Sequence, residues 1–220
     1  MPHRRSRLVA LCGALLIAVT TTGCIGAVDR ADFEKVIQAR GGGLVSTLPT
    51  AAIDTLRQRL GATDIHASVI LLAAPGSQNF RLTMLDQPPQ VTRFSNENRN
   101  LTNQDTAAHL RIRVPSRPDQ QDDYTFTNGT LHGPTPVHVS ASDDPDDEMF
   151  DVRDVSGLLR LEEILDTALT QAAVENGYVS SAMVNRIGPD TVITVNVSSP
   201  RTTVVTQFDR AGTFLRKSQA

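Results

Sequence analysis

The sequence has few flat aromatic side chains. It contains no tryptophan, seven phenylalanines and two tyrosines in 220 residues. Stacking on aromatic rings is a major source of binding to unpaired nucleic-acid bases, and large aromatic rings dominate many binding interfaces. We therefore do not expect a stacking platform for bases or sugars.

Cysteine is equally scarce. The only two cysteines are Cys12 and Cys24, and Cys12 lies in an apolar run near the N-terminus. Exported domains that lack a sufficient core often carry several disulfides, and this chain does not. Its stability must come from an ordinary hydrophobic core.

Strong catalytic and metal-binding motifs are also missing. There is no Gly-x-Ser-x-Gly sequence, and no phosphate-loop lysine follows the glycine triplet 41–43. Asp64, His66 and Ser68 alternate as on one strand face, where such neighbours lie about 6.6–7 Å apart, too far for direct proton transfer. The five histidines show no ligand spacing. We expect no catalytic residue, no metal site and no cofactor, so that an envelope hydrolase is the least supported function.

The first 24 residues have the pattern of an export signal. Three arginines precede an apolar run over 8–19, which is shorter than the roughly 20 residues that cross a bilayer. The sequence Thr21-Thr22-Gly23-Cys24 follows and resembles the lipobox of bacterial lipoproteins, with Thr21 where an aliphatic residue is usual. The resemblance implies cleavage after residue 23 and a diacylglycerol with acyl chains such as palmitate on Cys24. A plain secretory signal is the alternative.

Net charge limits the partners. The chain has 21 Lys and Arg against 24 Asp and Glu, and residues 1–23 contain three of the arginines and no acid, so the mature part has 18 − 24 = −6. This balance disfavours nucleic acid. We expect a protein on the extracytoplasmic face of the cell membrane, held there through Cys24.

Helical and strand periods alternate along the mature chain. Helical spacing predicts a short helix before Gly41 and a second helix from about Leu48 to Leu60, ended by Gly61. Alternation predicts strands over 65–73, 80–84, 91–95 and 110–114. Asn128-Gly129 then predicts a hairpin.

The second half repeats this order. A regular apolar stripe predicts a helix over 158–176, and strands follow over 179–187, around 193–198, over 203–208 and over 213–216. We expect an α+β fold of two helix-plus-antiparallel-sheet units, a possible tandem repeat. The expected segments are a signal peptide 1–23, a lipidated tether with a short helix 24–45, a first unit 46–142, an acidic linker 143–156 and a second unit 157–220.

Resemblances to known families come from element order and composition. The helix over 158–176 and its strands resemble the PepSY-like and β-lactamase-inhibitor-like units of exported bacterial proteins. Abundant Ala, Thr, Val, Arg and Asp with only two lysines resembles cell-envelope lipoproteins of GC-rich actinobacteria such as mycobacteria. These resemblances bring no functional residues.

Three functions therefore stay open. The first is a non-enzymatic lipoprotein that presents its sheet surface to an unknown envelope protein. The second is a carrier of lipid or another apolar ligand, similar to LprG-type lipoproteins, and the third is the hydrolase. The carrier requires the inward strand residues to line a cavity instead of the core: Ile65, Val69, Leu71, Leu82, Met84, Ile193, Val195 and Val197. Thr194 and Asn196 alternate with the inward residues Ile193, Val195 and Val197 of the same predicted strand, so we expect them to face outward.

Overall fold

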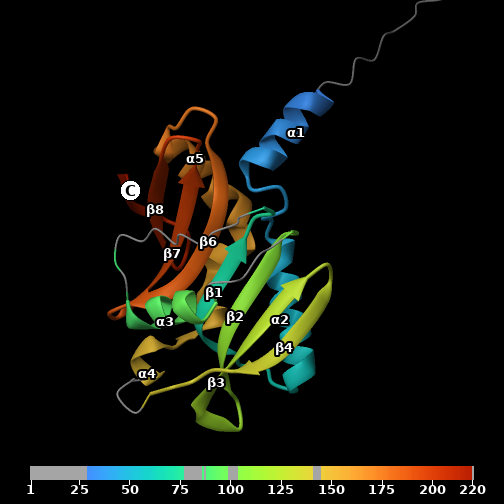
Figure 1. Ribbon diagram of the computed structural model, residues 1–220, viewed down its shortest axis with the longest axis vertical. Helices are drawn as coiled ribbons and strands as arrows, with labels where there is room; N and C mark the ends of the chain where they lie inside the picture. The colour runs from blue at the N-terminus through green and yellow to red at the C-terminus, as the bar shows by residue number, and fades with distance from the viewer. Residues whose placement is uncertain (1–28, 77–85, 87, 99–103, 141–144, 220) are drawn as a thin grey trace, which may run out of the picture.

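A single antiparallel sheet runs through the whole molecule (Figure 1). The computed structural model describes residues 29–76, 86, 88–98, 104–140 and 145–219. In these residues the sheet has the order β4-β3-β2-β1-β6-β7-β8-β9, and the short β5 also pairs with β1. The strands are β1 (His66–Ala73), β2 (Ala107–Val114), β3 (Arg117–Thr127), β4 (Thr130–Pro136), β5 (Phe150–Asp151), β6 (Tyr178–Ile187), β7 (Asp190–Ser198), β8 (Thr203–Asp209) and β9 (Phe214–Gln219).

Each half of the chain contributes one long helix and four consecutive strands. In the first half α2 (Thr47–Leu60) precedes β1 to β4, and in the second half α5 (Leu161–Ala172) precedes β6 to β9. Strands β1 and β6 pair antiparallel, from Val69↔Asn185 to Ala73↔Ser181. The predicted α+β class with two helix-plus-sheet units is confirmed, and the two halves share one sheet.

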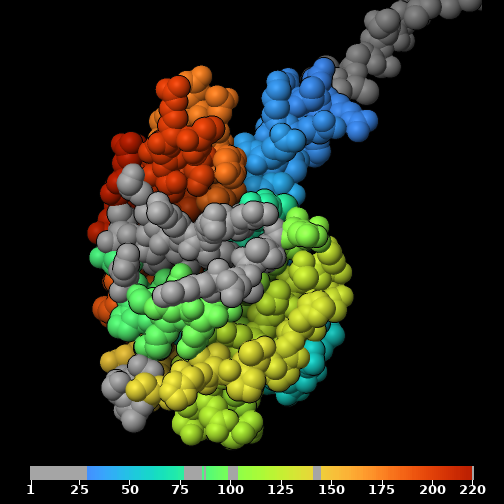
Figure 2. All heavy atoms as spheres, in the orientation of Figure 1, coloured from blue at the N-terminus to red at the C-terminus, as the bar shows by residue number. Residues whose placement is uncertain are grey.

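Helix α1 (Arg30–Ala39) stands out from this body (Figure 2). It has no buried residue, and its aspartate cap is Asp29, whose side chain accepts a hydrogen bond from the backbone N–H of Ala31. At the other end Arg40 makes two hydrogen bonds of 2.6 Å to Asp166 on α5. The helix is therefore fixed to the body near its C-terminus.

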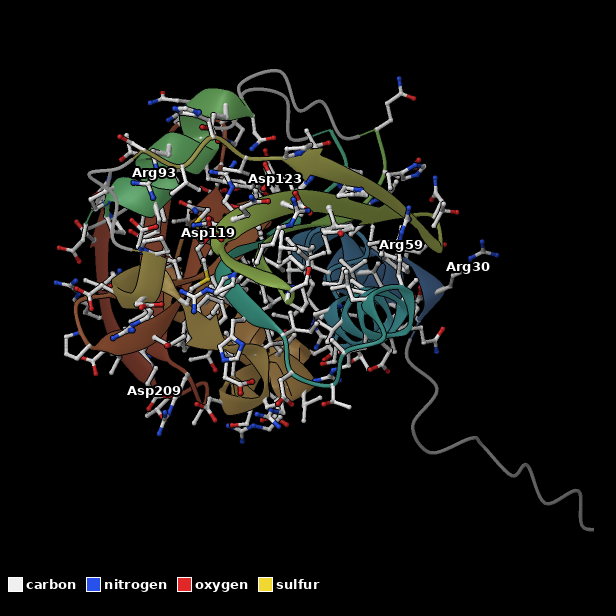
Figure 3. The ribbon with its side chains drawn as sticks, turned by 90° about the horizontal axis from the view of Figure 1, so that it is seen from below. Arg30, Arg59, Arg93, Asp119, Asp123 and Asp209 are labelled. Atoms are coloured by element: carbon white, nitrogen blue, oxygen red, sulfur yellow. The ribbon has the colours of Figure 1, made fainter. Side chains whose placement is uncertain are left out.

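The sheet has a different helical cover on each face (Figure 3). Helices α2 and α5 lie on one face, which we call the core face. Helix α3 (Pro89–Glu97) lies on the opposite face, which we call the polar face, and packs Val91 and Phe94 against Val69, Leu71 and Met183.

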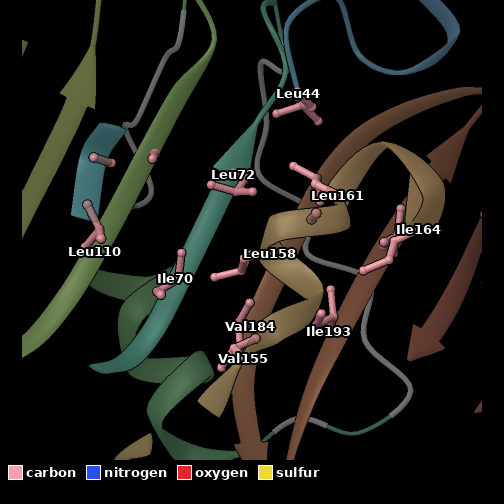
Figure 4. Packing of buried hydrophobic residues seen from close by; sticks show 14 of the residues in the cluster. Leu44, Ile70, Leu72, Leu110, Val155, Leu158, Leu161, Ile164, Val184 and Ile193 are labelled. Carbon is pink, nitrogen blue, oxygen red and sulfur yellow. The ribbon is translucent and has the colours of Figure 1, made fainter. Parts of the chain in front are cut away.

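The main hydrophobic core lies between α2, α5 and the core face (Figure 4). Leu110 and Ile193, one from each half, belong to this single cluster and are fully or almost fully buried. The two helices also cap each other: Glu162 accepts from the backbone N–H of Ser46 (2.9 Å), and the Ser46 hydroxyl accepts from the backbone N–H of Leu161 (2.9 Å) and donates to Glu162. Each half thus satisfies backbone donors of the other.

Two predicted segments are different in the structure. The stretch expected as a strand over 91–95 is the helix α3, which begins with Pro89 at its first position, where the missing N–H of proline costs nothing. The acidic stretch over 143–156 is more than a solvated linker: α4 (Pro145–Glu148), β5, and the 3₁₀ turns η1 (Val152–Asp154) and η2 (Ser156–Arg160) follow one another there. Its apolar residues enter the core, and Phe150 is 5% exposed.

Candidate functional site

The residues predicted to face an apolar ligand lie on two different faces of the sheet. Ile65, Ile193, Val195 and Val197 are at most 1% exposed and belong to the main core. Val69 and Leu71 were expected with Ile65, but the register shift between Ala67 and Val69 turns them to the polar face, under α3. Leu82, Met84 and Cys24 lie outside the described residues.

The polar residues Asp64, His66 and Ser68, just before and in β1, do not form a common site. Asp64 forms an ion pair of 2.8 Å with Arg153, and the buried Ser68 hydroxyl donates to the side-chain oxygen of Gln121 at 3.2 Å. His66 is exposed. In the described part of the chain no group of three or more His, Cys, Asp or Glu side chains could hold a metal ion.

On the polar face, the first half carries buried charges that are paired. Arg111 is 2% exposed, donates to Asp123 at 2.8 and 2.7 Å and to Glu97 on α3 at 2.6 Å, and lies 5.1 Å from the ring centre of Phe94. Burial alone would lower the pKa of Arg111, but the hydrogen bonds and charges of Asp123 and Glu97 outweigh it and raise the pKa. This cluster fastens α3 to β2 and β3.

His109 is the second buried ionisable group of this region. Its Nδ1 lies 3.0 Å from the hydroxyl of Thr125 on β3. Burial lowers the pKa of His109 to about 4, against the opposing charge of Asp123. The imidazole is therefore neutral at physiological pH and serves the packing of the first half.

The second half buries uncharged polar side chains that lack partners. Asn185 on β6, Thr194 and Asn196 on β7 and Gln207 on β8 are at most 2% exposed. Each has one buried side-chain atom without a hydrogen bond: Oδ1 of both asparagines, Oγ1 of Thr194 and Nε2 of Gln207. A buried polar group without a partner costs about 1–3 kcal/mol, so such a concentration on three adjacent strands requires an explanation.

A pocket of about 590 Å³ begins at the edge of this group. It lies between the β6–β7 turn and the β8–β9 hairpin, and Gln207 belongs to its lining. Arg216 donates from Nε to the Gln207 oxygen at 2.7 Å and pairs with Asp86, which leaves the Gln207 amide nitrogen as the unpartnered atom. Leu215 on the same wall is 51% exposed.

The two charged residues Asp209 and Arg210 in the pocket lining differ in whether their charged groups already have partners. Asp209 accepts from the backbone N–H groups of Ala211 (2.9 Å) and Thr213 (2.8 Å), which outweigh its burial and lower its pKa. Figure 3 shows Asp209 far from Asp123, so the pocket and the Arg111 cluster are distinct. Arg210 is exposed and forms no ion pair with the described residues.

The pocket also adjoins an edge of the sheet. Among the described strands, β9 pairs only with β8 and β4 pairs only with β3. Strand β4 carries Pro134 and Pro136, which lack the N–H that another strand would need, whereas β9 contains no proline. We call the combination of β9, Leu215, Gln207, Arg210 and the pocket the β9 site.

No pattern in the sequence marks the β9 site. Alternation predicts Thr194 and Asn196 on the face opposite Ile193, pointing outward, and the structure confirms the face. The two residues are nevertheless buried there, at 0% and 2% exposed. The polar residues of β7 and β8 are interspersed with valine, isoleucine and phenylalanine. This pattern predicts which residues share a face of the sheet, but it does not predict whether other parts of the chain cover that face.

Comparisons with known proteins give little further information. No protein-family model and no curated protein matches the chain. One solved structure, described as a "putative lipoprotein" from Clostridium difficile, is similar at 11% identity with a TM-score of 0.42, over 77% of this chain and 90% of that chain. The likeness is too distant to assign a family, and the PepSY-like and actinobacterial resemblances stay predictions.

None of the helices in the described part of the chain has the length and apolar character that a membrane crossing requires.

Proposed function

We propose that the chain is an exported, non-enzymatic binding protein that is held at the extracytoplasmic face of the membrane by lipid on Cys24. Its α+β domain binds an extended segment of a partner protein along β9. One side chain of that segment enters the pocket of the β9 site. The observation that carries the proposal is a pocket beside a proline-free edge strand, with Gln207 in its lining and the buried Nε2 of that residue left without a partner.

Peptide addition to a sheet edge fits this geometry. The backbone N–H and C=O groups of an edge strand can pair with an added strand, and pockets that receive alternate side chains provide specificity. The buried amide of Gln207 can donate to an acceptor on the entering side chain. Exposed Arg210 favours a carboxylate or amide, such as Glu or Gln, at that position.

Carriage of an apolar ligand has less support. A carrier would need Ile65, Ile193 and Val195 around a cavity, and these residues pack in the main core with α5. The pockets of about 260 and 370 Å³ lie elsewhere, beside α2 and η2, and Leu159 lines both of them.

A site-specific photo-crosslinking experiment tests the partner. A photoreactive amino acid replaces Leu215 beside the pocket, and in the matched control it replaces Thr135, which is exposed on the β4 edge. A discrete adduct from position 215 but not from position 135 is expected in the native host. Titration of the purified partner should then give at least about tenfold weaker binding to Leu215→Glu and Arg210→Glu, and unchanged binding to Thr135→Glu. Equal adducts from positions 215 and 135 would contradict the proposal. Partner binding that is unchanged by Leu215→Glu and Arg210→Glu would also contradict it.

The anchor has its own test. The mature protein should begin at Cys24 and show the added mass of a diacylglycerol and an acyl chain. The Cys24→Ala variant should lose this mass and leave the membrane fraction. A secreted wild-type protein without acyl mass would instead indicate a plain secretory signal.

A further inference from the structure

We infer that α1 lies flat in the interface of the lipid bilayer and sets the orientation of the domain at the membrane. The inference rests on the proposed lipid anchor at Cys24. It goes beyond the anchor because it assigns a second, non-covalent membrane contact to named side chains.

The first observation is an apolar stripe without a cover. Phe33 and Val36 are 56% and 44% exposed, and half-buried Ile37 continues the stripe at helical spacing. Phe33 and Val36 are two of the exposed large apolar residues among those described, and they lie one turn apart. A protein that kept this helix in water would gain nothing from the stripe.

The second observation is the length of chain between the predicted anchor and the helix. Only five residues lie between Cys24 and Arg30, so even a fully extended tether spans at most about 20 Å. Helix α1 itself is about 15 Å long. Lipid on Cys24 would therefore keep α1 next to the headgroups, and a bilayer is the apolar phase within its reach.

The charges of α1 predict how it binds. Arg30 pairs with Glu34 at 2.7 Å and Lys35 pairs with Asp32 at 3.3 Å, so the helix presents no excess of positive charge. Interfacial helices that depend on anionic lipid carry a basic polar face. Binding of α1 should therefore depend on its apolar stripe and respond little to salt or anionic lipid.

Because α1 is attached to the domain, a contact between α1 and the membrane would also fix the orientation of the domain. The bidentate pair of Arg40 with Asp166 joins the end of α1 to α5. Gly41 follows with φ +87°, and an added Cβ would lie 2.7 Å from the backbone oxygen of Val179, so the chain is closely packed at this turn. A helix held in the interface would thus hold the β6 to β9 end of the sheet near the membrane (Figure 1).

The absence of tryptophan gives a direct test. Phe33→Trp places a single tryptophan on the stripe of the full-length, acylated protein, and Gln120→Trp places one in the exposed β2–β3 region at the opposite end of the molecule (Figure 1). Both variants are reconstituted on phosphatidylcholine vesicles with and without phosphatidylglycerol. The Phe33→Trp emission should shift to the blue and be quenched by brominated phosphatidylcholine, equally in both compositions, and the Gln120→Trp emission should do neither.

A second substitution separates the helix from the anchor. Adding Val36→Asp to Phe33→Trp should abolish the blue shift and the quenching, while the protein still floats with the vesicles and keeps its far-ultraviolet circular dichroism. Water-like emission of Phe33→Trp in a protein that carries acyl mass and floats would overturn the inference and leave the anchor standing. A blue shift without bromolipid quenching would indicate a protein contact and also overturn it. A chain without acyl mass would overturn the proposed anchor, and the inference with it.

Discussion

The two halves of the sheet use their polar face differently. One cross-strand row runs from Thr125 and His109 through Leu71 to Thr194 and Gln207. All except Thr125 are at most 3% exposed. On the first-half side His109 and Thr125 face each other at 3.0 Å, whereas Thr194 and Gln207 each retain an unpartnered atom.

Under the proposed function, this difference assigns stability to the first half of the sheet and binding to the second. In the first half, buried polar groups hold α3 and satisfy one another, with Nε of Arg113 as the exception. In the second half, one atom of each of four buried polar side chains has no partner, and one of these residues, Gln207, lines a pocket beside the proline-free strand β9. Functional sites commonly carry such uncompensated costs, because a ligand and not the fold supplies the missing partner. The comparison predicts opposite responses to matched substitutions in the two halves.

The largest effect is expected at Arg111. Arg111→Met should cost about 4 kcal/mol of unfolding free energy, because it leaves Asp123 and Glu97 without their buried counter-charge and α3 without its attachment. Equilibrium urea denaturation, followed by circular dichroism, measures the change.

The control for Arg111→Met is Arg153→Met. Arg153 also pairs with two carboxylates, those of Asp64 and Asp151, but is exposed, so its loss should have a small effect. Equal losses from the two variants would show that the Arg111 cluster is no more important to the fold than a surface ion pair.

The next effect is a pH dependence that originates in the first half. Because the pKa of His109 falls from 6.5 in the unfolded chain to about 4 in the fold, the unfolded chain binds more protons between these values. Stability is therefore complete above pH 6.5 and decreases by on the order of 3 kcal/mol as the pH falls towards 4. Thermal or urea unfolding at a series of pH values measures this slope.

His109→Gln tests the origin of the slope. The variant keeps a polar group beside Thr125 but cannot titrate, so its stability should change much less between pH 6.5 and 4. The carboxylates with a lowered pKa, Asp151, Glu162 and Asp209, lose their contribution as the pH falls below their unfolded values of 4.5 for Glu and 3.8 for Asp, so they steepen only the acid end of this window. The raised pKa of Asp122 acts in the opposite sense. An unchanged slope in His109→Gln would show that another group titrates there.

A smaller effect should reach both halves at once. Ser46→Ala removes the hydroxyl that accepts from Leu161 and donates to Glu162, and should cost about 1 kcal/mol, as other helix caps do. Because this cap joins α2 to α5, hydrogen exchange should become faster at the start of both helices. Thr50→Ala, which removes only a hydrogen bond to the backbone of its own helix, is the control and should not affect α5.

Local signals in the sequence were sufficient for most elements. Gly61, with φ +60°, ends α2 as predicted, and Asn128 and Gly129, with φ +50° and +73°, form the predicted turn between β3 and β4. Strands β6 to β9 follow from period-two alternation. The helix predicted to run to residue 176 ends instead at Ala172, with Ala173 in the left-handed conformation, which the sequence does not signal because alanine rarely adopts it.

The remaining features depend on contacts between distant residues. The register shift after Ala67 moves Val69 and Leu71 to the other face, and no local pattern marks it. By contrast, Val91 and Phe94 are three residues apart, which is a helical spacing, and Pro89 suits a first helical turn, so here the sequence did carry a signal for a helix that the prediction of a strand missed. The pocket of the β9 site joins residues from four strands and the two turns between them, and alternation along one strand cannot predict it.

The smallest effect gives the sharpest test of the comparison between the halves. Thr194→Val removes an unpartnered buried hydroxyl and should raise the unfolding free energy by up to about 1 kcal/mol, whereas Thr125→Val removes a partner of His109 and should lower it by about 1 kcal/mol. Both positions lie two strands from Leu71 in the same row, although Thr194 is buried and Thr125 is half-buried. If Thr194→Val stabilises the fold and Thr125→Val destabilises it, the two halves differ as the hydrogen bonds indicate, and the second half carries a cost in stability that the first half avoids. If both substitutions destabilise, the hydroxyl of Thr194 already has a partner such as water, and the two halves are equivalent.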